Sequence, residues 1–159
     1  MPTSDVDLFE ALYPGLCRFA AAVRPVGIDP EDLVQEALAK TLAVRTLGSI
    51  DEPVAYLRTA MIHIAANLSR SARRSHARLI RQHAPGTGLD AYPSDLADLM
   101  RLDPRARAVL YLTIIEDESY RTAASIVGCS EAAARTLASR ALRTLRQELT
   151  GDLDRKDSL

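Results

Sequence analysis

Arginine is the residue type through which this chain could act on a partner. Between residues 119 and 147 there is one acid, Glu131, and there are five arginines: Arg121, Arg135, Arg140, Arg143 and Arg146. A guanidinium presents a planar fork of N–H donors that fits phosphate oxygens or the edge of a guanine. The segment therefore indicates a surface that binds nucleic acid, although the sequence does not say which arginine would read a base and which would hold a phosphate.

Two helices and a tight turn must position these arginines. Ser119 can cap a first helix over residues 120–127, Gly128 can end it in the left-handed conformation, and Ser130 can cap a second helix. This pattern predicts a helix-turn-helix, whose second helix enters the DNA major groove. The outward face of that helix is expected to carry Arg135, Thr136, Ser139, Arg140 and Arg143.

A second basic segment lies in the middle of the chain, where residues 53–89 contain six arginines and no acid. We expect a helix from 53 to about 74, with an inner apolar stripe formed by Val54, Leu57, Met61, Ile64, Ala65 and Leu68. The opposite stripe carries Tyr56, Thr59, His63, Asn67, Arg70 and Arg74. A ring, hydrogen-bonding groups and guanidiniums on one stripe are typical of a nucleic-acid surface. An ordinary solvated face remains the alternative.

Residues 29–36 form an acidic segment, with four acids and no base. It begins a helix expected from 30 to about 46, and we interpret it as a solvated or partner-facing surface. A calcium site is not expected, because no loop glycine follows at the required place. Cys17 and Cys129 are interpreted as small core residues, and the three histidines lack metal-ligand spacing. No catalytic arrangement is recognised, and no cofactor is expected.

The composition predicts an all-α fold. Of the 159 residues, 47% are hydrophobic and only 4% aromatic, with no Trp. Three acid–proline pairs, at 29–30, 52–53 and 103–104, predict helix starts. A first helix is expected over about 6–23, kinked or split at Pro14 and Gly15.

The expected organisation is two small helical domains joined by a flexible linker. Residues 1–81 form the first domain. Residues 82–93, with two Gly and two Pro, form the linker. Residues 94–150 form the second domain, which begins with a short helix capped by Ser94, and residues 151–159 form a frayed polar tail. No membrane span is expected, and the acidic N-terminus lacks the features of a secretory signal, so a cytoplasmic location is the default.

Residues 29–42 and 55–74 resemble region 2 of the extracytoplasmic-function (ECF) sigma factors of bacterial RNA polymerase, and residues 102–146 resemble their region 4. The resemblance covers most of the chain, in the right order and with the expected spacing. It implies a non-enzymatic subunit that binds core RNA polymerase and directs promoter-specific transcription initiation. An anti-sigma factor is a usual partner in this family, and whether this chain has one stays open.

The resemblance also implies roles for the three surfaces. The acidic helix would dock on the clamp helices of the polymerase largest subunit through Asp32, Gln35 and Glu36. The stripe from Tyr56 to Arg74 would open and read the minus-ten promoter element, and the helix-turn-helix would read the minus-thirty-five element. Tyr56 stands where the family usually has Trp, and the loop over 46–53, which captures an unstacked base in relatives, is short here.

Two other functions are compatible with the same residues. A stand-alone helix-turn-helix regulator would bind its operator without polymerase. In a helical interaction protein the arginines would contact only solvent. The net charge of −1 is low for a protein that binds DNA without a partner, because nonspecific affinity for DNA comes largely from neutralising its phosphates. A subunit whose DNA affinity is supplied mostly by polymerase need not be basic overall.

Overall fold

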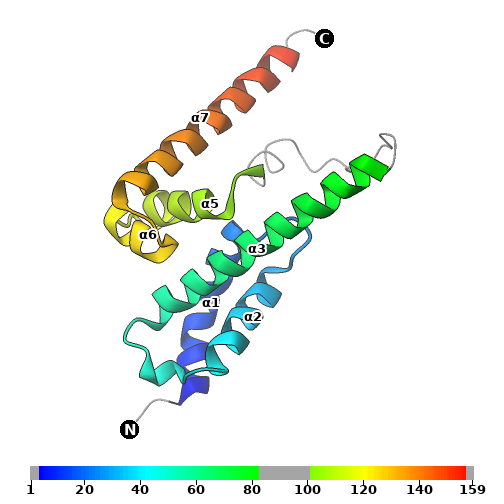
Figure 1. The fold of residues 1–159 in the computed structure, drawn as a ribbon. Helices are drawn as coiled ribbons and strands as arrows, with labels where there is room; N and C mark the ends of the chain where they lie inside the picture. The colour runs from blue at the N-terminus through cyan, green and yellow to red at the C-terminus, as the bar shows by residue number, and fades with distance from the viewer. Residues whose placement is uncertain (1–3, 83–100, 157–159) are drawn as a thin grey trace.

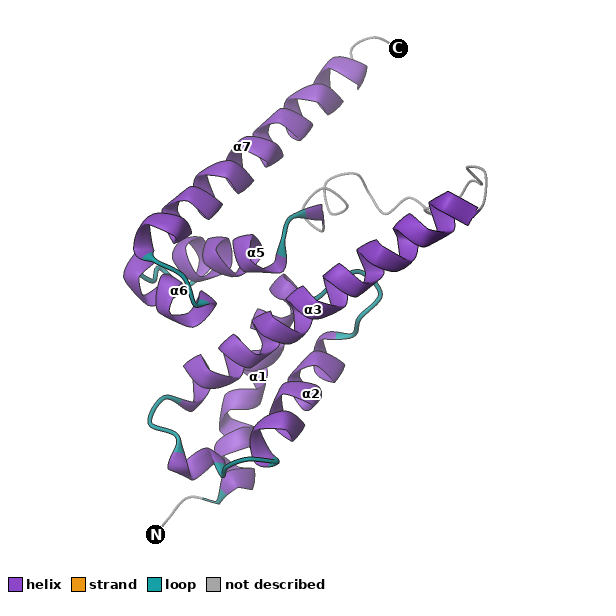
Figure 2. Ribbon diagram, viewed as in Figure 1, coloured by secondary structure: helices purple, strands orange, loops and turns teal. Residues whose placement is uncertain are grey.

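A computed structural model describes residues 4–82 and 101–156, and every regular element within them is helical (Figure 2). The all-α prediction is therefore confirmed. The elements are α1 (Asp5–Val23), α2 (Pro30–Leu42), the 3-10 turn η1 (Leu47–Ser49), α3 (Pro53–Gln82), α5 (Pro104–Leu110), the π-helical turn η2 (Tyr111–Ile115), α6 (Tyr120–Val127) and α7 (Glu131–Lys156).

Three helix starts lie where the acid–proline pairs predicted them, since α2, α3 and α5 each begin at the proline. Proline fits there because the first helical N–H would have no intrahelical partner in any case. At α2 and α5 the preceding acid, Asp29 or Asp103, also accepts a 2.8 Å hydrogen bond from the backbone amide two residues later. Local chemistry thus sets these three boundaries.

Helix α1 is a single helix, so of the kink or split expected at Pro14 the split does not occur. Proline in a helix interior removes a hydrogen bond and costs about 3 kcal/mol. Pro14 is exposed, whereas Leu16, Phe19 and Ala20 are buried within the next two turns. Burial of this apolar face accounts for a helix that continues through the proline.

Three helix ends differ from expectation. Helix α2 stops at Leu42 rather than near 46, and α3 continues beyond 74 to Gln82, the first residue of the expected linker. Helix α7 continues past Gly151 to Lys156, where we expected a frayed tail. One glycine costs a helix interior only about 1 kcal/mol, so Gly151 alone need not end α7. The rest of the expected linker, 83–93, and the helix capped by Ser94 lie outside the described residues.

The helices form two groups that pack against each other (Figure 1). Helices α1, α2 and α3 make a three-helix bundle. Helix α5 packs on α1 and α3, α6 packs on α3, and α7 packs on α5 and α6. One continuous cluster of buried side chains runs through both groups. Phe19 of α1 meets Tyr111 of η2 edge to face, with 5.6 Å between ring centroids.

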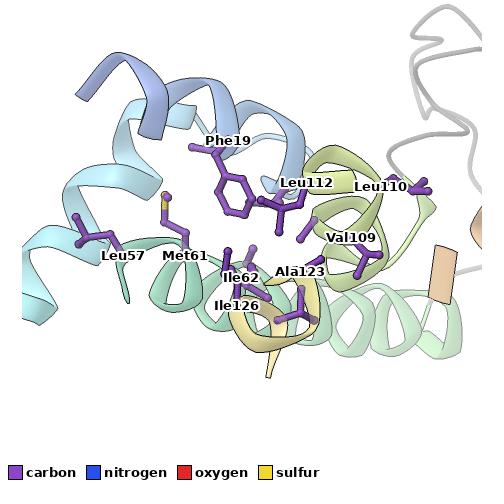
Figure 3. Close-up of a cluster of buried hydrophobic side chains, with 14 of the residues drawn as sticks. Phe19, Leu57, Met61, Ile62, Val109, Leu110, Leu112, Ala123 and Ile126 are labelled. Atoms are coloured by element: carbon purple, nitrogen blue, oxygen red, sulfur yellow. The ribbon is translucent and has the colours of Figure 1, made fainter. Parts of the chain in front are cut away.

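Helix α3 is buried on two sides, whereas the sequence pattern predicted a single buried stripe. The predicted stripe is buried at Leu57, Met61 and Ile64, as expected, but Ile62 and Ala66 are buried as well. Figure 3 shows Ile62 lying beside Ile126 and Ala123 of α6. The second buried side exists because α5 and α6 pack against α3.

Candidate nucleic-acid interface

The helix-turn-helix forms as its capping residues predicted. Ser119 Oγ accepts a hydrogen bond from the backbone N–H of Thr122 at 3.1 Å, and Ser130 Oγ accepts one from that of Ala133 at 3.1 Å. Gly128 ends α6 with a φ of 80°, a left-handed conformation that suits glycine. The turn is thereby fixed by side-chain and backbone chemistry within twelve residues of sequence.

The outward surface of α7, here called the α7 face, consists of the five predicted residues, all of them exposed: Arg135, Thr136, Ser139, Arg140 and Arg143. Two contacts orient the Arg135 guanidinium. Its Nη2 lies 2.9 Å from Glu131 Oε1, and the guanidinium carbon lies 4.6 Å from the centre of the Tyr120 ring. Arg135 is thus already oriented, while Arg140 and Arg143 offer exposed positive charge one and two turns further along.

The predicted stripe of α3, here called the α3 face, is exposed over its C-terminal part: His63, Asn67, Arg70 and Arg74. Arg70 Nη2 donates to Asn67 Oδ1 at 2.8 Å, which holds the amide and the guanidinium together. At the N-terminal end Tyr56 is half-buried, with the Arg45 guanidinium 5.3 Å from its ring centre. The α3 face therefore has a basic half in solvent and an aromatic half that is partly covered.

Thr59 of the α3 face lies against α6. Its hydroxyl oxygen is 2.9 Å from the carbonyl oxygen of Ala55 and 2.8 Å from that of Ile126. A hydroxyl has one proton and can donate to only one of them at a time. Beside it is an open hollow of about 350 Å³, whose walls include Tyr56 and Arg45 on one side and Ser125 and Ile126 of α6 on the other.

The loop before α3 is anchored by the start of α1. The Asp5 carboxylate accepts hydrogen bonds from the backbone N–H groups of Leu47 (3.2 Å) and Gly48 (3.0 Å), and Leu47 is fully buried. The short 46–53 loop is thus held in one shape at the edge of the hollow. Ser49, Ile50 and Asp51 of this loop also line it.

The acidic surface of α2, here called the α2 face, consists of Asp32, Gln35 and Glu36, all exposed. Glu36 pairs with Lys40 one turn later at 3.0 Å, and both side chains are well exposed, so this pair contributes little to stability. Leu33, Val34 and Ala37 turn the opposite side of α2 into the core. The α2 face is therefore available to a partner.

Sequence reasoning missed two buried arginines that join the two groups of helices. Arg58 of α3 is 9% exposed and forms a two-pronged ion pair with Glu116, at 2.8 and 2.7 Å. Arg107 of α5 is 3% exposed, and burial lowers its pKa to about 10, so it still carries its charge at neutral pH. The burial of Arg107 could have been suspected from the sequence, because this residue lies within the apolar run from Ala106 to Leu110.

Among the side chains that the structure describes in residues 4–82 and 101–156, no group of three or more His, Cys, Asp or Glu could hold a metal ion. Within the same part of the chain, no helix is both long and apolar enough to cross a membrane.

Family models match both groups of helices. The model for sigma-70 region 2 matches residues 8–83, and the model for sigma-70 region 4 matches residues 99–145. The two matches follow each other in the order that the sequence motifs indicated, and together they cover the α2, α3 and α7 faces.

Curated relatives agree with the family models. The RNA polymerase sigma-E factor of Streptomyces coelicolor is 31% identical, with 87% of this chain and 82% of that protein aligned. The ECF RNA polymerase sigma factor SigJ of Mycobacterium tuberculosis is 30% identical over 94% of this chain. The chain spans only 54% of the length of SigJ.

A solved structure shares the fold. The sigma factor RpoE of Bartonella quintana, crystallised in complex with the anti-sigma factor NepR, matches with a TM-score of 0.58 and 25% identity, over 90% of this chain and 94% of that one. With two sigma-70 regions in order and relatives of this similarity, the chain belongs to the ECF sigma factors, subunits of RNA polymerase that direct transcription initiation.

Proposed function

We propose that this sigma factor divides its work among three surfaces: the α2 face docks on the clamp helices of the polymerase largest subunit, the α3 face engages the minus-ten element, and the α7 face reads the minus-thirty-five element. It acts in the cytoplasm as a non-enzymatic subunit. The observation that carries the proposal is the segregation of charge, with an exposed acidic face on α2 and exposed basic faces on α3 and α7.

The chemistry of each face fits its partner. Exposed carboxylates on α2 would repel DNA phosphates and attract a basic protein surface. On α7, Arg140 and Arg143 can form bidentate pairs with guanine in the major groove or hold phosphates. On α3, the Tyr56 ring offers a stacking platform for an unpaired base, and Arg70 and Arg74 lie further along the same stripe, where a single strand would run.

An anti-sigma partner is a further part of the proposal. It is supported by the similarity to RpoE, which was crystallised with NepR.

A gel-shift comparison tests the proposal against its rivals. With core polymerase added, the chain should shift a promoter fragment that polymerase alone does not shift specifically. A stand-alone regulator would give the same specific shift without polymerase, and an interaction protein would give none in either case.

The polymerase-docking role is tested by Asp32→Arg. This change places a positive charge on the α2 face, and we expect about tenfold weaker capture of core polymerase, since a like-charge contact costs about 1 kcal/mol or more. Glu10→Arg makes the same change at an exposed position of α1 and should leave capture unaltered. Equal capture by the Asp32 variant and its control would remove the α2 face from the proposal.

A further inference from the structure

The turn η1 begins with two backbone amides that its own residues do not satisfy. The first N–H groups of a helical turn have no partner within that turn, and the side chain just before it commonly accepts from them. Thr46 stands at that place, but its side chain makes no capping hydrogen bond. An acceptor for the N–H groups of Leu47 and Gly48 must therefore come from outside the turn.

Asp5, in the first turn of α1, supplies this acceptor. Its Oδ2 accepts from the Leu47 N–H at 3.2 Å and its Oδ1 from the Gly48 N–H at 3.0 Å, across 42 and 43 positions of the chain. The start of α1 and η1 lie side by side at this end of the bundle (Figure 1). Asp5 also precedes the family-model match to region 2, which begins at residue 8. The cap is thus a feature of this chain that the family model does not include.

The hydrogen bonds to the loop are separate from the role of an acid at a helix start. A carboxylate in the first turn complements the helix dipole, and both Asp5 and Asp7 occupy the first turn of α1. Asp7 is exposed, whereas Asp5 is partly buried and has both carboxylate oxygens engaged with the loop. The contacts of Asp5 with the loop are therefore additional to a role that Asp7 shares.

The capped turn leads directly into one wall of the hollow beside Tyr56. Ser49, Ile50 and Asp51 line this hollow, and Ser49 is the last residue of η1. The Ile50 N–H donates to the Leu47 carbonyl oxygen at 3.1 Å, so the position of the wall depends on that of the first residue of the turn. A base stacked on the Tyr56 ring would lie against this wall.

We infer that Asp5 is a positioning residue for the capture of an unpaired base, because its carboxylate holds the turn from which the wall beside Tyr56 is built. The inference rests on the proposed minus-ten role of the α3 face. Asp5 does not touch the base and acts only through the turn. Without the cap the loop samples other shapes, and the fraction of molecules that can hold the base falls, which weakens binding by the same factor.

The test compares variants of the full chain. Asp5→Ala removes both acceptor oxygens, and Asp7→Ala makes the same charge change in the same helical turn as the matched control. Asp5→Ala combined with Thr46→Asp moves the carboxylate to the cap position of η1 itself, where aspartate is favourable, and keeps the net charge of the parent. Asp5→Asn retains the size of the side chain but only one acceptor oxygen, and it carries the test if Asp5→Ala does not fold.

The first readout is hydrogen exchange of the loop amides, measured by NMR without any DNA. The Leu47 and Gly48 amides should exchange about tenfold faster in Asp5→Ala than in the parent, as expected for loss of a hydrogen bond to a charged group. Asp7→Ala should match the parent, and the double variant should regain protection at Gly48. Equal exchange in Asp5→Ala and the parent, or unprotected amides in the parent, would overturn the inference.

The second readout is specific to one base, so a merely structural role would not move it. Core polymerase carrying each variant is titrated with a promoter that the parent transcribes, whose non-template strand is unpaired across the minus-ten element. One base at a time is replaced by an abasic site. In the parent, removal of the base that stacks on Tyr56 should weaken binding about tenfold.

Loss of the cap should remove most of this penalty. The penalty should shrink to about twofold in Asp5→Ala, stay near the parent value in Asp7→Ala and return in the double variant. If Asp5→Ala weakened binding to every DNA by one factor and left the penalty unaltered, or if the double variant did not regain it, the inference would be wrong. Absence of any abasic penalty in the parent would instead contradict the proposed minus-ten role, and with it the inference that rests on that role.

Discussion

The two helices proposed to contact DNA differ in how much of their chemistry is already engaged within the protein. On α7 the whole face is exposed, and the contacts of Arg135 orient the side chain without covering it. On α3 the basic half is exposed, but Tyr56 and Thr59 border the hollow that α6 helps to form. A rigid exposed helix can read duplex DNA, whereas capture of an unpaired base needs an aromatic ring on which the base can stack.

The largest effect is expected on the α7 face. Changing Arg140 and Arg143 together to Ala should lower promoter-dependent transcription about a hundredfold, if each guanidinium contributes about 1–2 kcal/mol of promoter binding. Capture of core polymerase should not change. Arg18→Ala, at an exposed position on α1, is the matched control. A double variant that transcribes like this control would mean that the α7 face does not meet promoter DNA.

A smaller effect, confined to strand opening, is expected on the aromatic end of the α3 face. Tyr56→Ala should reduce formation of the open promoter complex about tenfold, because stacking of one base on an aromatic ring is worth about 1–3 kcal/mol. Tyr56→Phe keeps the ring and should stay near the parent. Permanganate reactivity of unpaired thymines measures the effect. Equal losses in both variants would show that the hydroxyl, and not the ring, is what matters.

The smallest effect is expected at Asn67. Its amide oxygen accepts from Arg70, so Asn67→Ala removes one polar group of the α3 face and releases a guanidinium that can still reach phosphate. Promoter transcription should fall only about threefold, within the range of one modest hydrogen bond. Run-off yield relative to Ser69→Ala, a half-buried neighbour on α3, gives the comparison. A loss as large as that of the Arg140 and Arg143 double variant would reverse the ranking of the two faces.

Features set by neighbouring residues could be predicted from the sequence. The helix-turn-helix depends on Ser119, Gly128 and Ser130, each acting within a few residues, and the structure has all three caps in place. The three proline helix starts have the same origin. The polar and basic residues of the α7 face follow from helical spacing once those caps are known.

Features that depend on distant partners could not be predicted. Arg58 looked like one more basic residue of an acid-free segment, yet its partner lies 58 positions further along the chain. Two of the carbonyl groups that accept from Arg107 are 83 and 85 positions away. The second buried side of α3, at Ile62 and Ala66, likewise arises only when α5 and α6 pack against this helix.

Run-off transcription with core RNA polymerase tests the division of labour most directly. Added to core enzyme on fragmented genomic DNA, the parent chain should produce discrete transcripts that core enzyme alone does not make. Asp32→Arg should lower these transcripts together with polymerase capture, and the Arg140 and Arg143 double variant should lower them with capture intact. If the parent chain left the transcripts of core enzyme unaltered on every template, or if both variants failed in the same way, the account would be contradicted.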